Sequence, residues 1–333
     1  MTNAKATAWA AAVVAAGGTV SAGRLVLCST FYDALDLHGI YAKLDSLFII
    51  SPDGAGNTPS AYMDYVRLTQ GTAHATGTLA AGGWKGDGST GYFDTGFTPG
   101  VGSQYQAASC HAFVYTTSTR AVGGSGNPAN EMALFGNDVA VSGELYLLPK
   151  WADLNTYWGL SDAAGSVDGP GAIAGAIAGA WCMTSTGPWG YRNGGTATQN
   201  FASTVTPNRT LSILLGACRS SGTVTYHSSD PIVAFSMGSG LTQVQYLALV
   251  DAVNDYLTGL GVNTYPPAMD LTTTENVDAV AFSGGGKTMD LATIENLDTA
   301  AFTATNLSSG WQTQTDAPSG WVIIYPSPTP PST

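Results

Sequence analysis

The sequence predicts a mainly β protein, with a β-sandwich between flanking helices and a small β-repeat module behind it. Three observations predict this fold: short apolar runs between clusters of Gly, Asn, Pro and Ser over residues 72–236, one amphipathic helix after residue 241, and a repeat beyond Pro266. The composition agrees, because only 10% of the residues are charged, against about 25% in typical domains. The 42 glycines suit a fold with many turns.

Two helices are predicted before the strands. Residues 4–16 are rich in Ala and place Trp9, Val13 and Ala16 at helical spacing, and Gly17-Gly18 ends the run. Ser21 can cap a second helix that ends near His38-Gly39. The strand candidates that follow are residues 47–50, 111–115, 132–135, 144–148, 181–184, 211–215 and 232–235.

A third helix is predicted to close the sandwich. Thr242 is its expected N-cap, and Gly261 is expected to end it. Its apolar residues step by four, three, four and three, which places them on one face that we expect to pack on the sandwich: Tyr246, Val250, Val253, Leu257 and Leu260. We therefore bound the sandwich domain at residues 1–262.

The C-terminal region contains an internal repeat. Residues 269–282 (MDLTTTENVDAVAF) recur with a period of 20 as residues 289–302 (MDLATIENLDTAAF), and residues 311–325 form a diverged third unit. Each unit reads as strand, turn and strand, so residues 266–325 are predicted to be β-hairpins, with a Pro-rich extended tail over 326–333. Because a lone hairpin cannot bury its apolar face, these units must stack. The candidates for contacts between chains are Met269, Leu271, Phe282, Met289, Leu291, Phe302, Trp311 and Trp321.

Charge and hydropathy exclude two classes of partner. The formal net charge is -12 with only 11 Lys and Arg, so a phosphate-binding surface for nucleic acid is not expected. No run of 18 apolar residues exists, so membrane insertion is not expected. The N-terminus imitates a signal peptide, but its apolar stretch is short and Lys5 is its only charge, so we expect it to be retained.

The four cysteines lack any metal-binding spacing. They form no C-x-x-C pair, and no His lies at zinc-ligand spacing from them. We expect buried free thiols, and one long-range disulfide stays open as the alternative. The four are Cys28, Cys110, Cys182 and Cys218.

Three segments resemble one family. Residues 8–45 carry AW, GGTVS and KLD; residues 86–97 read GDGSTGYFDTGF; residues 235–257 carry FSMG, LT and YL. Together they resemble phage virion proteins with a concanavalin-like, laminin-G-type domain, of the tail fibre, minor tail or head-decoration type. The C-terminal repeat is similar to short repeats of phage structural proteins. The resemblance implies a concanavalin-like jelly roll and a place on the phage particle, with no catalytic residues to carry over.

The second segment also contains a candidate cation site. Asp87 and Asp94 are weak candidates for calcium, because two carboxylates fall short of the six to eight oxygens that calcium takes. A structural turn at Gly86-Asp87-Gly88 is the favoured interpretation, and neither a metal nor another cofactor is expected.

Aromatic side chains are the candidates for carbohydrate contact. Sugar sites combine aromatic platforms with polar rims. Residues 189–195 (WGYRNGG) resemble the tip of a hairpin, which would expose its rings, although packing in the core or between chains is the favoured role for any single aromatic residue. The candidates are Trp158, Trp189, Tyr191 and Asn193.

The predicted function is that of a non-enzymatic structural protein on the surface of a phage particle. The sandwich is expected to belong to a surface-exposed fibre or adhesin that contacts the host surface. Carbohydrate binding is one form that this contact could take. Two alternatives stay open: an architectural head-decoration or minor tail protein without a ligand, and a polysaccharide-degrading enzyme. The expected partners are other virion proteins and copies of this chain, as a trimer by resemblance to phage fibres. No compact pair of acids or nucleophile motif predicts catalysis.

Overall fold

The computed structural model describes most of the N-terminal 264 residues and two short strands beyond them. The described residues are 2–100, 103–106, 109–118, 132–138, 144–149, 156–162, 178–184, 189–192, 195–198, 211–262, 264, 311–314 and 323–326. The chain divides into two compact units, Met1–Ala268 and Met269–Thr333, next to the Pro266-Pro267 pair.

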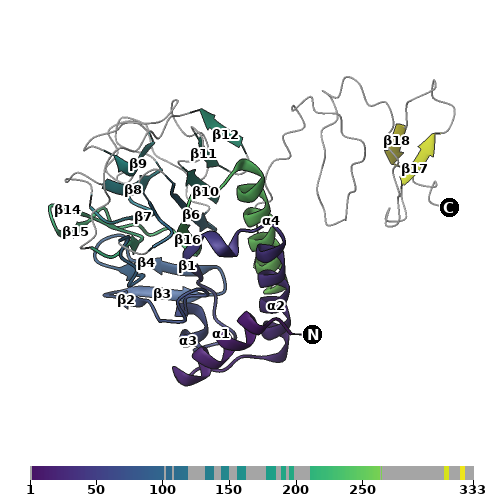
Figure 1. The fold of residues 1–333 in the computed structure, drawn as a ribbon, viewed down its shortest axis with the longest axis horizontal. Helices are drawn as coiled ribbons and strands as arrows, with labels where there is room; N and C mark the ends of the chain where they lie inside the picture. Colours follow the sequence, from purple (N-terminus) through teal and green to yellow (C-terminus); the bar gives the residue numbers. More distant parts are fainter. Residues whose placement is uncertain are drawn as a thin grey trace, which may run out of the picture. The chain divides into compact units, whose positions relative to one another are not determined.

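The first unit is a sandwich of two antiparallel sheets, which confirms the predicted mainly β, jelly-roll-like fold class (Figure 1). One sheet, here the helix-covered sheet, has the order β12-β11-β10-β6-β16-β4-β3, and β1 also pairs with β16. Its strands are β1 (Leu44–Ile49), β3 (Gly77–Ala80), β4 (Gly83–Gly86), β6 (His111–Thr116), β10 (Gly179–Thr184), β11 (Trp189–Arg192), β12 (Gly195–Thr198) and β16 (Ile232–Gly238).

The other sheet, here the open sheet, has the order β2-β5-β13-β7-β8-β9. A separate two-stranded hairpin, β14 (Cys218–Ser220) with β15 (Thr223–Thr225), follows β13 in the chain. The strands of the open sheet are β2 (Thr72–His74), β5 (Tyr92–Asp94), β7 (Phe135–Gly136), β8 (Glu144–Leu148), β9 (Tyr157–Asp162) and β13 (Leu214–Leu215).

The side chains of strand β6 contribute to two apolar clusters, one on each face of the sheet. Successive side chains of a strand point to opposite faces of its sheet. Ala112 and Val114 lie in the apolar cluster between the two sheets, while Phe113 and Tyr115 lie in the cluster beneath the helices. All six residues of β6 are therefore buried, and the strand reads as a continuous apolar run rather than an alternating one.

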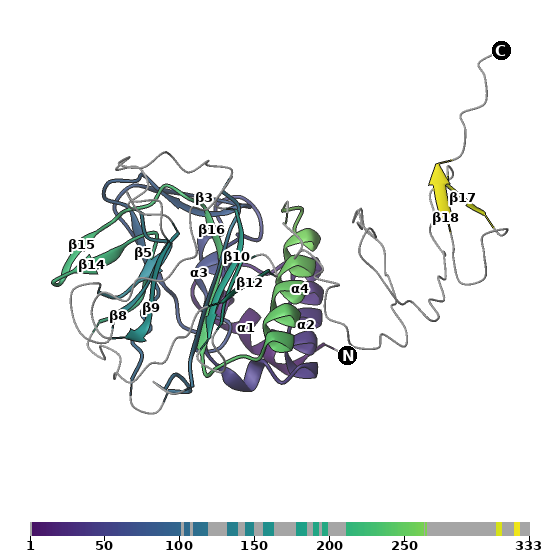
Figure 2. The same ribbon diagram turned by 90° about the horizontal axis from the view of Figure 1, so that it is seen from above.

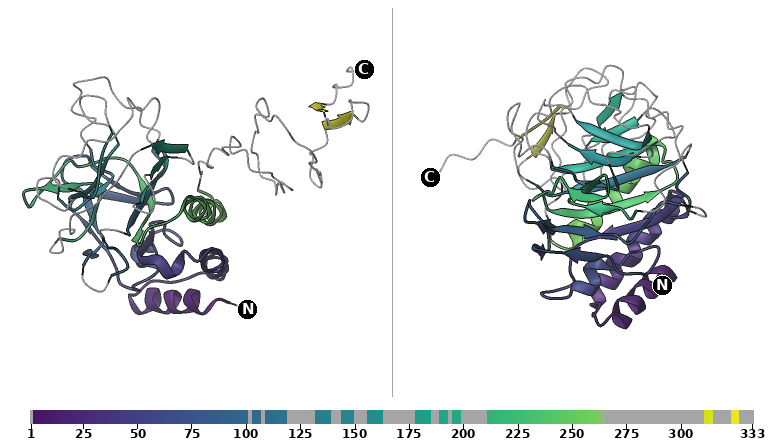
Figure 3. Two further views of the ribbon diagram at one scale, coloured as in Figure 1. Left: turned by 45° about the horizontal axis from the view of Figure 1, so that its top comes forward. Right: turned by 90° about the vertical axis from the view of Figure 1, so that its left-hand side faces the viewer.

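Three helices cover the outer face of the helix-covered sheet (Figures 2 and 3). They are α1 (Ala4–Ala15), α2 (Ala22–Leu37) and α4 (Gln243–Gly259), close to the predicted bounds. The predicted caps are confirmed, because the Ser21 side chain accepts from Arg24 N and Thr242 forms a capping box with Gln245. Two short helices, η1 (Tyr41–Lys43) and α3 (Thr58–Tyr62), flank β1.

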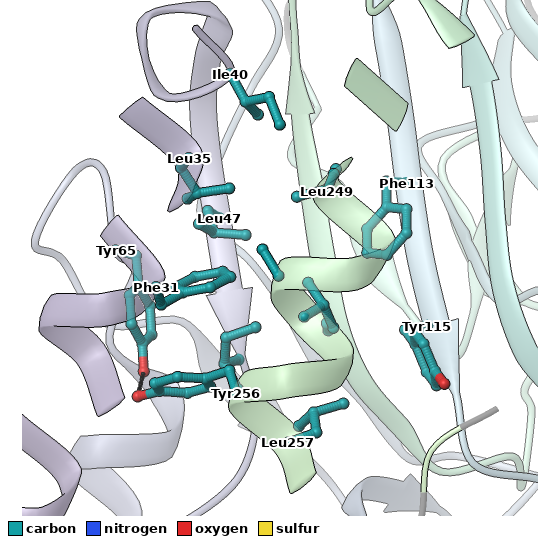
Figure 4. Packing of buried hydrophobic residues seen from close by; sticks show 14 of the residues in the cluster. Phe31, Leu35, Ile40, Leu47, Tyr65, Phe113, Tyr115, Leu249, Tyr256 and Leu257 are labelled. Carbon is teal, nitrogen blue, oxygen red and sulfur yellow. Dashed lines mark hydrogen bonds between the residues drawn. The ribbon is translucent and has the colours of Figure 1, made fainter. Parts of the chain in front are cut away.

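Aromatic side chains join the helices to the sheet (Figure 4). The rings of Phe31 on α2 and Tyr256 on α4 have centroids 5.0 Å apart. The hydroxyl groups of Tyr65 and Tyr256 are 2.7 Å apart and share a hydrogen bond. The predicted stripe of α4 lies in this layer, with Tyr246, Val250, Val253 and Leu257 buried in the same cluster.

Two predicted strands are shorter than expected. Of residues 132–135 only Phe135 lies in a strand, because Ala133 donates its N–H to the carbonyl of Tyr226 in a connecting segment. Of residues 211–215 only Leu214 and Leu215 do so, and Ile213 donates its N–H to the carbonyl of Phe97. Apolar runs thus predicted burial correctly but overstated the length of the ladders.

The four cysteines are buried and stay as thiols, with no disulfide among the described residues, as expected. Burial raises the pKa of the Cys28 thiol to about 12, so this side chain stays neutral. Among the described residues, no helix combines the length and the apolar character needed to cross a membrane.

The described part of the second unit is one hairpin. Strand β17 (Trp311–Gln314) pairs antiparallel with β18 (Ile323–Pro326), from Trp311 opposite Pro326 to Gln314 opposite Ile323. Apart from Pro326, both strands lie within the predicted third repeat unit, and the turn expected between them lies outside the described residues. The other candidates for contacts between chains lie outside the described residues: Met269, Leu271, Phe282, Met289, Leu291, Phe302 and Trp321.

Candidate binding face on the open sheet

The outer face of the open sheet carries the candidate site. Helices α1, α2 and α4 lie on the far side of the sandwich from this sheet (Figure 2). In β5, Phe93 points into the core between the sheets, so its neighbours Tyr92 and Asp94 point outward. Strand β2 pairs with β5 and places His74 directly opposite Tyr92.

Three rings form a row at this face, called here the aromatic row: His74, Tyr92 and His227. His74 and Tyr92 are stacked, with centroids 4.6 Å apart and planes 14° from parallel. The centroid of His227 is 6.2 Å from that of Tyr92. All three residues are half-buried.

A polar cluster begins two residues along β5 from Tyr92. Ser212 Oγ donates to Asp94 Oδ2 at 2.9 Å, and Gly96 N donates to Asp94 Oδ1 at 2.8 Å. Arg219 Nη2 is 4.0 Å from the same carboxylate, and Arg219 Nη1 donates to the carbonyl of Ser212 at 2.7 Å. The side chains of Asp94 and Arg219 are 24% and 12% exposed, so both reach the surface. This cluster offers an acceptor and a donor side by side.

One excursion of the chain, residues 216–228, brings Arg219 and His227 to this face. This segment lies in close contact with the outer face of the sheet. A Cβ added to Gly136 of β7 would lie only 2.5 Å from Cys218 Cβ, so the close approach requires glycine at position 136. The carboxylate of Asp138, which is 1% exposed, accepts from the N–H groups of Ser221 and Gly222 and so anchors the turn between β14 and β15. At its other end, Ser228 N donates to the carbonyl of Gly216 at 2.7 Å.

Backbone strain gathers around the aromatic row. The described residues include four non-glycine residues with positive φ, and three of them border the row or its excursion: Ala75 (54°), Ser221 (50°) and Tyr226 (53°). Ala75 directly follows His74, and Tyr226 directly precedes His227. Such conformations cost on the order of 1–3 kcal/mol each and concentrate at functional sites.

The carbohydrate-contact residues proposed from the sequence lie elsewhere. Trp189 and Tyr191 are in β11 of the helix-covered sheet, whereas Trp158 is in β9 of the open sheet. Strands β11 and β12 form the expected hairpin, but the two aromatic residues lie within its strand rather than at its tip. Asn193 lies outside the described residues.

The two weak calcium candidates have separate roles. The Asp87 carboxylate accepts from the N–H groups of Ser89, Thr90 and Gly91, and these hydrogen bonds lower its pKa well below the usual range. This is the structural turn favoured from the sequence. Asp94 belongs to the polar cluster described above. Over the described part of the chain, no group of three or more His, Cys, Asp or Glu residues could hold a metal ion.

Sequence reasoning missed His74, His227, Arg219 and Ser212. Within β5, buried Phe93 alternates with half-buried Tyr92 and Asp94, which is the pattern of a strand with two different faces. Nothing near residue 92 points to residues 74 or 227, because cross-strand pairing and the excursion over the sheet bring them together. A single sequence carries no local signal for such contacts.

Comparisons with known proteins give distant structural likeness only. No protein-family model and no curated protein matches the chain. A Trypanosoma rangeli sialidase in complex with sialic acid is 15% identical with a TM-score of 0.44, over 69% of this chain and 39% of that one. Domain 4 of AbnA, a GH43 extracellular arabinanase from Geobacillus stearothermophilus, in complex with arabinotriose, is 16% identical with a TM-score of 0.44, over 62% of this chain and 98% of that one. The chain spans about two fifths of the sialidases or less.

These comparisons correct the predicted function. The solved structures named above are a sialidase and an arabinanase domain, and neither is a phage protein. The prediction of a structural protein of a phage particle is therefore wrong against these findings, and we withdraw it together with its adhesin and decoration versions. At such identities and scores no activity carries over from the neighbours.

Proposed function

We propose that the open sheet binds a carbohydrate across the aromatic row and the polar cluster. The observation that carries this proposal is the row itself: the stacked His74–Tyr92 pair with His227 beside it, half-buried on a sheet face away from the helices. The chain is proposed to act as a binding protein without catalysis.

Ring geometry supports the choice of a sugar. The His74 and Tyr92 rings are stacked only 14° from parallel, so each covers one face of the other and holds it in place, and the remaining ring faces and edges form the platform. The C–H face of a pyranose or furanose packs on such a surface, since aromatic side chains combine an apolar body with a polar tip. The Tyr92 hydroxyl and the ring nitrogens of the two histidines provide polar groups at the rim.

The polar cluster supports orientation of that sugar. A carboxylate accepts hydrogen bonds at about four positions, and the described contacts of Asp94 occupy two of them. Neighbouring hydroxyl groups of a sugar can donate to Asp94 and accept from Arg219. The Asp94–Arg219 contact is itself long, at 4.0 Å, and contributes little stability at such exposure, about 0–1 kcal/mol. The ion pair therefore adds little to folding, and both groups can also serve a ligand.

The test is a glycan array probed with the full chain, followed by calorimetric titration of the best ligand with the chain and its variants. Tyr92→Ala is expected to raise Kd at least tenfold, about 1.4 kcal/mol, because the platform is lost. Tyr92→Phe keeps the ring and is expected to stay within about threefold.

A matched control compares half-buried His74 with the exposed His38, which lies on the helix side of the sandwich. His74→Ala is expected to weaken binding, whereas His38→Ala, at the C-terminal end of α2, is expected to leave Kd unchanged. Failure of the full chain to bind any glycan, or equal binding by the wild type and Tyr92→Ala, would contradict the proposal. Release of reducing sugar from the bound glycan would contradict its non-catalytic part.

A further inference from the structure

The helix layer contains a buried cation without a charged partner among the described residues. Arg24 of α2 is 1% exposed. Its Nη2 donates to the carbonyl of Ser51 at 3.0 Å and to the hydroxyl of Tyr65 at 3.2 Å. No described acid lies within ion-pair distance of it; the ion pairs among the described residues are Lys5–Asp36, Arg67–Asp64 and Arg219–Asp94. A buried charge without an opposite charge beside it lowers the stability of the folded state by several kcal/mol.

Four donor atoms around this arginine lack partners among the described residues. They are Arg24 Nε, Arg24 Nη1, Trp9 Nε1 and Ser51 Oγ, and their three residues are each 1% exposed or less. The residues are neighbours, because the Arg24 guanidinium carbon is 5.7 Å from the centre of the Trp9 ring and Ser51 already accepts from Arg24. Buried donors are satisfied in more than nine cases of ten, so several together indicate a bound species.

The surrounding groups do not supply a negative charge. Burial raises the pKa of the Tyr65 hydroxyl and of the Cys28 thiol, each to about 12, so both stay neutral at ordinary pH. The rings of Trp9 and Tyr256 lie 5.7 and 5.0 Å from the guanidinium carbon and offer only their π faces. Asp53 is the one carboxylic acid whose charge raises the pKa of Arg24, and its carboxylate accepts hydrogen bonds from the N–H and the hydroxyl of Ser21 rather than from Arg24.

We propose that Arg24, Trp9 and Ser51 form an internal site for a small monovalent inorganic anion of the halide class. The donor set selects an anion over water. The three unpartnered nitrogens can only donate, and the Ser51 hydroxyl is the one member of the set that could accept from a water molecule, which has two hydrogens to place. An anion satisfies the nitrogens and the Ser51 hydroxyl at once and compensates the guanidinium charge. This site is separate from the carbohydrate face and does not depend on it.

Thermal unfolding of the full chain tests the site. Sodium bromide is compared with sodium gluconate at equal ionic strength, because gluconate is too large for a buried three-residue site. The melting temperature is expected to rise with bromide concentration, as for any ligand that binds only the folded state. Trp9→Phe keeps the ring that stacks on Tyr65 at 4.8 Å and removes one donor, so the apparent Kd for bromide is expected to rise roughly tenfold.

Two further measurements decide the outcome. Lys85→Gln removes an exposed cation and is expected to show the wild-type bromide response. Crystals soaked in bromide are expected to show one anomalous peak within hydrogen-bonding distance of Arg24 Nε and Trp9 Nε1. Equal bromide responses in wild type and Trp9→Phe, or a soaked crystal with only a water at this position, would overturn the proposal. The most direct variant, Arg24→Gln, removes a buried side chain and could fail to fold. The bromide response of Trp9→Phe and the soaked crystals decide the proposal without that variant.

Discussion

At the residue scale, His111 is a histidine that the fold keeps neutral. It begins β6 and is fully buried, with Nδ1 2.6 Å from the carbonyl of Ser239 and Nε2 3.2 Å from Ser236 Oγ. Burial lowers its pKa from 6.5 to about 4; the carbonyl of Ser239 opposes this shift and the charge of Lys43 adds to it. A neutral ring can donate from Nδ1 and accept at Nε2, which matches its two partners.

This histidine predicts a loss of stability in mild acid. Between pH 6.5 and about 4 the unfolded chain binds a proton at His111 that the folded chain does not, so stability falls as pH falls through this window. The free energy of unfolding is expected to drop by up to about 3 kcal/mol from this group alone. Urea titrations at pH 7, 5 and 4 measure it. His111→Asn should have a shallower pH dependence, and an equal dependence in the two proteins would show that other groups are responsible.

At the element scale, α4 shows how far a local pattern reaches. Its apolar stripe, N-cap and C-terminal glycine all follow from residues within the helix, and the helix forms as predicted. What the stripe packs on is decided by the sheet: α4 lies over the cluster that includes Phe113 and Tyr115 of β6. Tyr115 also donates from its hydroxyl to Asn254 of α4 at 2.8 Å, which joins helix and strand.

The capping box of α4 predicts a measurable contribution to folding. Thr242→Ala removes the side-chain acceptor of Gln245 N and should lower the free energy of unfolding by about 1 kcal/mol. Thr258→Ala changes an exposed threonine near the other end of the same helix and should stay within about 0.5 kcal/mol of the wild type. Chemical unfolding monitored by circular dichroism compares the two, and equal losses would remove the capping explanation.

At the scale of the whole molecule, the chain builds two compact units of different size. The sandwich unit contains its own cores, one between the sheets and one beneath the helices. The β17–β18 hairpin belongs to the second unit. Because an isolated hairpin is marginally stable in water, the second unit needs stacked repeats or another chain, and its association with further copies of this chain stays a prediction.

Deletion of residues 269–333 tests this division. Because the sandwich unit buries its own cores, its melting temperature should change by no more than about 2 °C, as measured by calorimetry. Light scattering should find the full chain associated and the shortened chain monomeric. If the shortened chain associates to the same degree, the repeats are not the element that joins the copies.

Features carried by neighbouring residues were determined by the sequence alone. The bounds of α1, α2 and α4, the caps Ser21 and Thr242 and the buried strands β6, β8, β10 and β16 follow from periodicity, capping side chains and apolar runs. The short strands β3 and β14 were not predicted, because a run of four or fewer residues is too short to show the alternation typical of a strand.

Only the tertiary structure decided which distant residues come together at the two candidate sites. It paired His74 with Tyr92, brought His227 beside them from an excursion more than 130 residues away, and placed Arg24 against Trp9 without a counter-charge. It also put Trp158 and Trp189 on different sheets. Local periodicity reports which face of an element is buried, but not which distant element covers it. Contacts between distant residues depend on strand order and chain crossings, which leave no trace in the residues beside them.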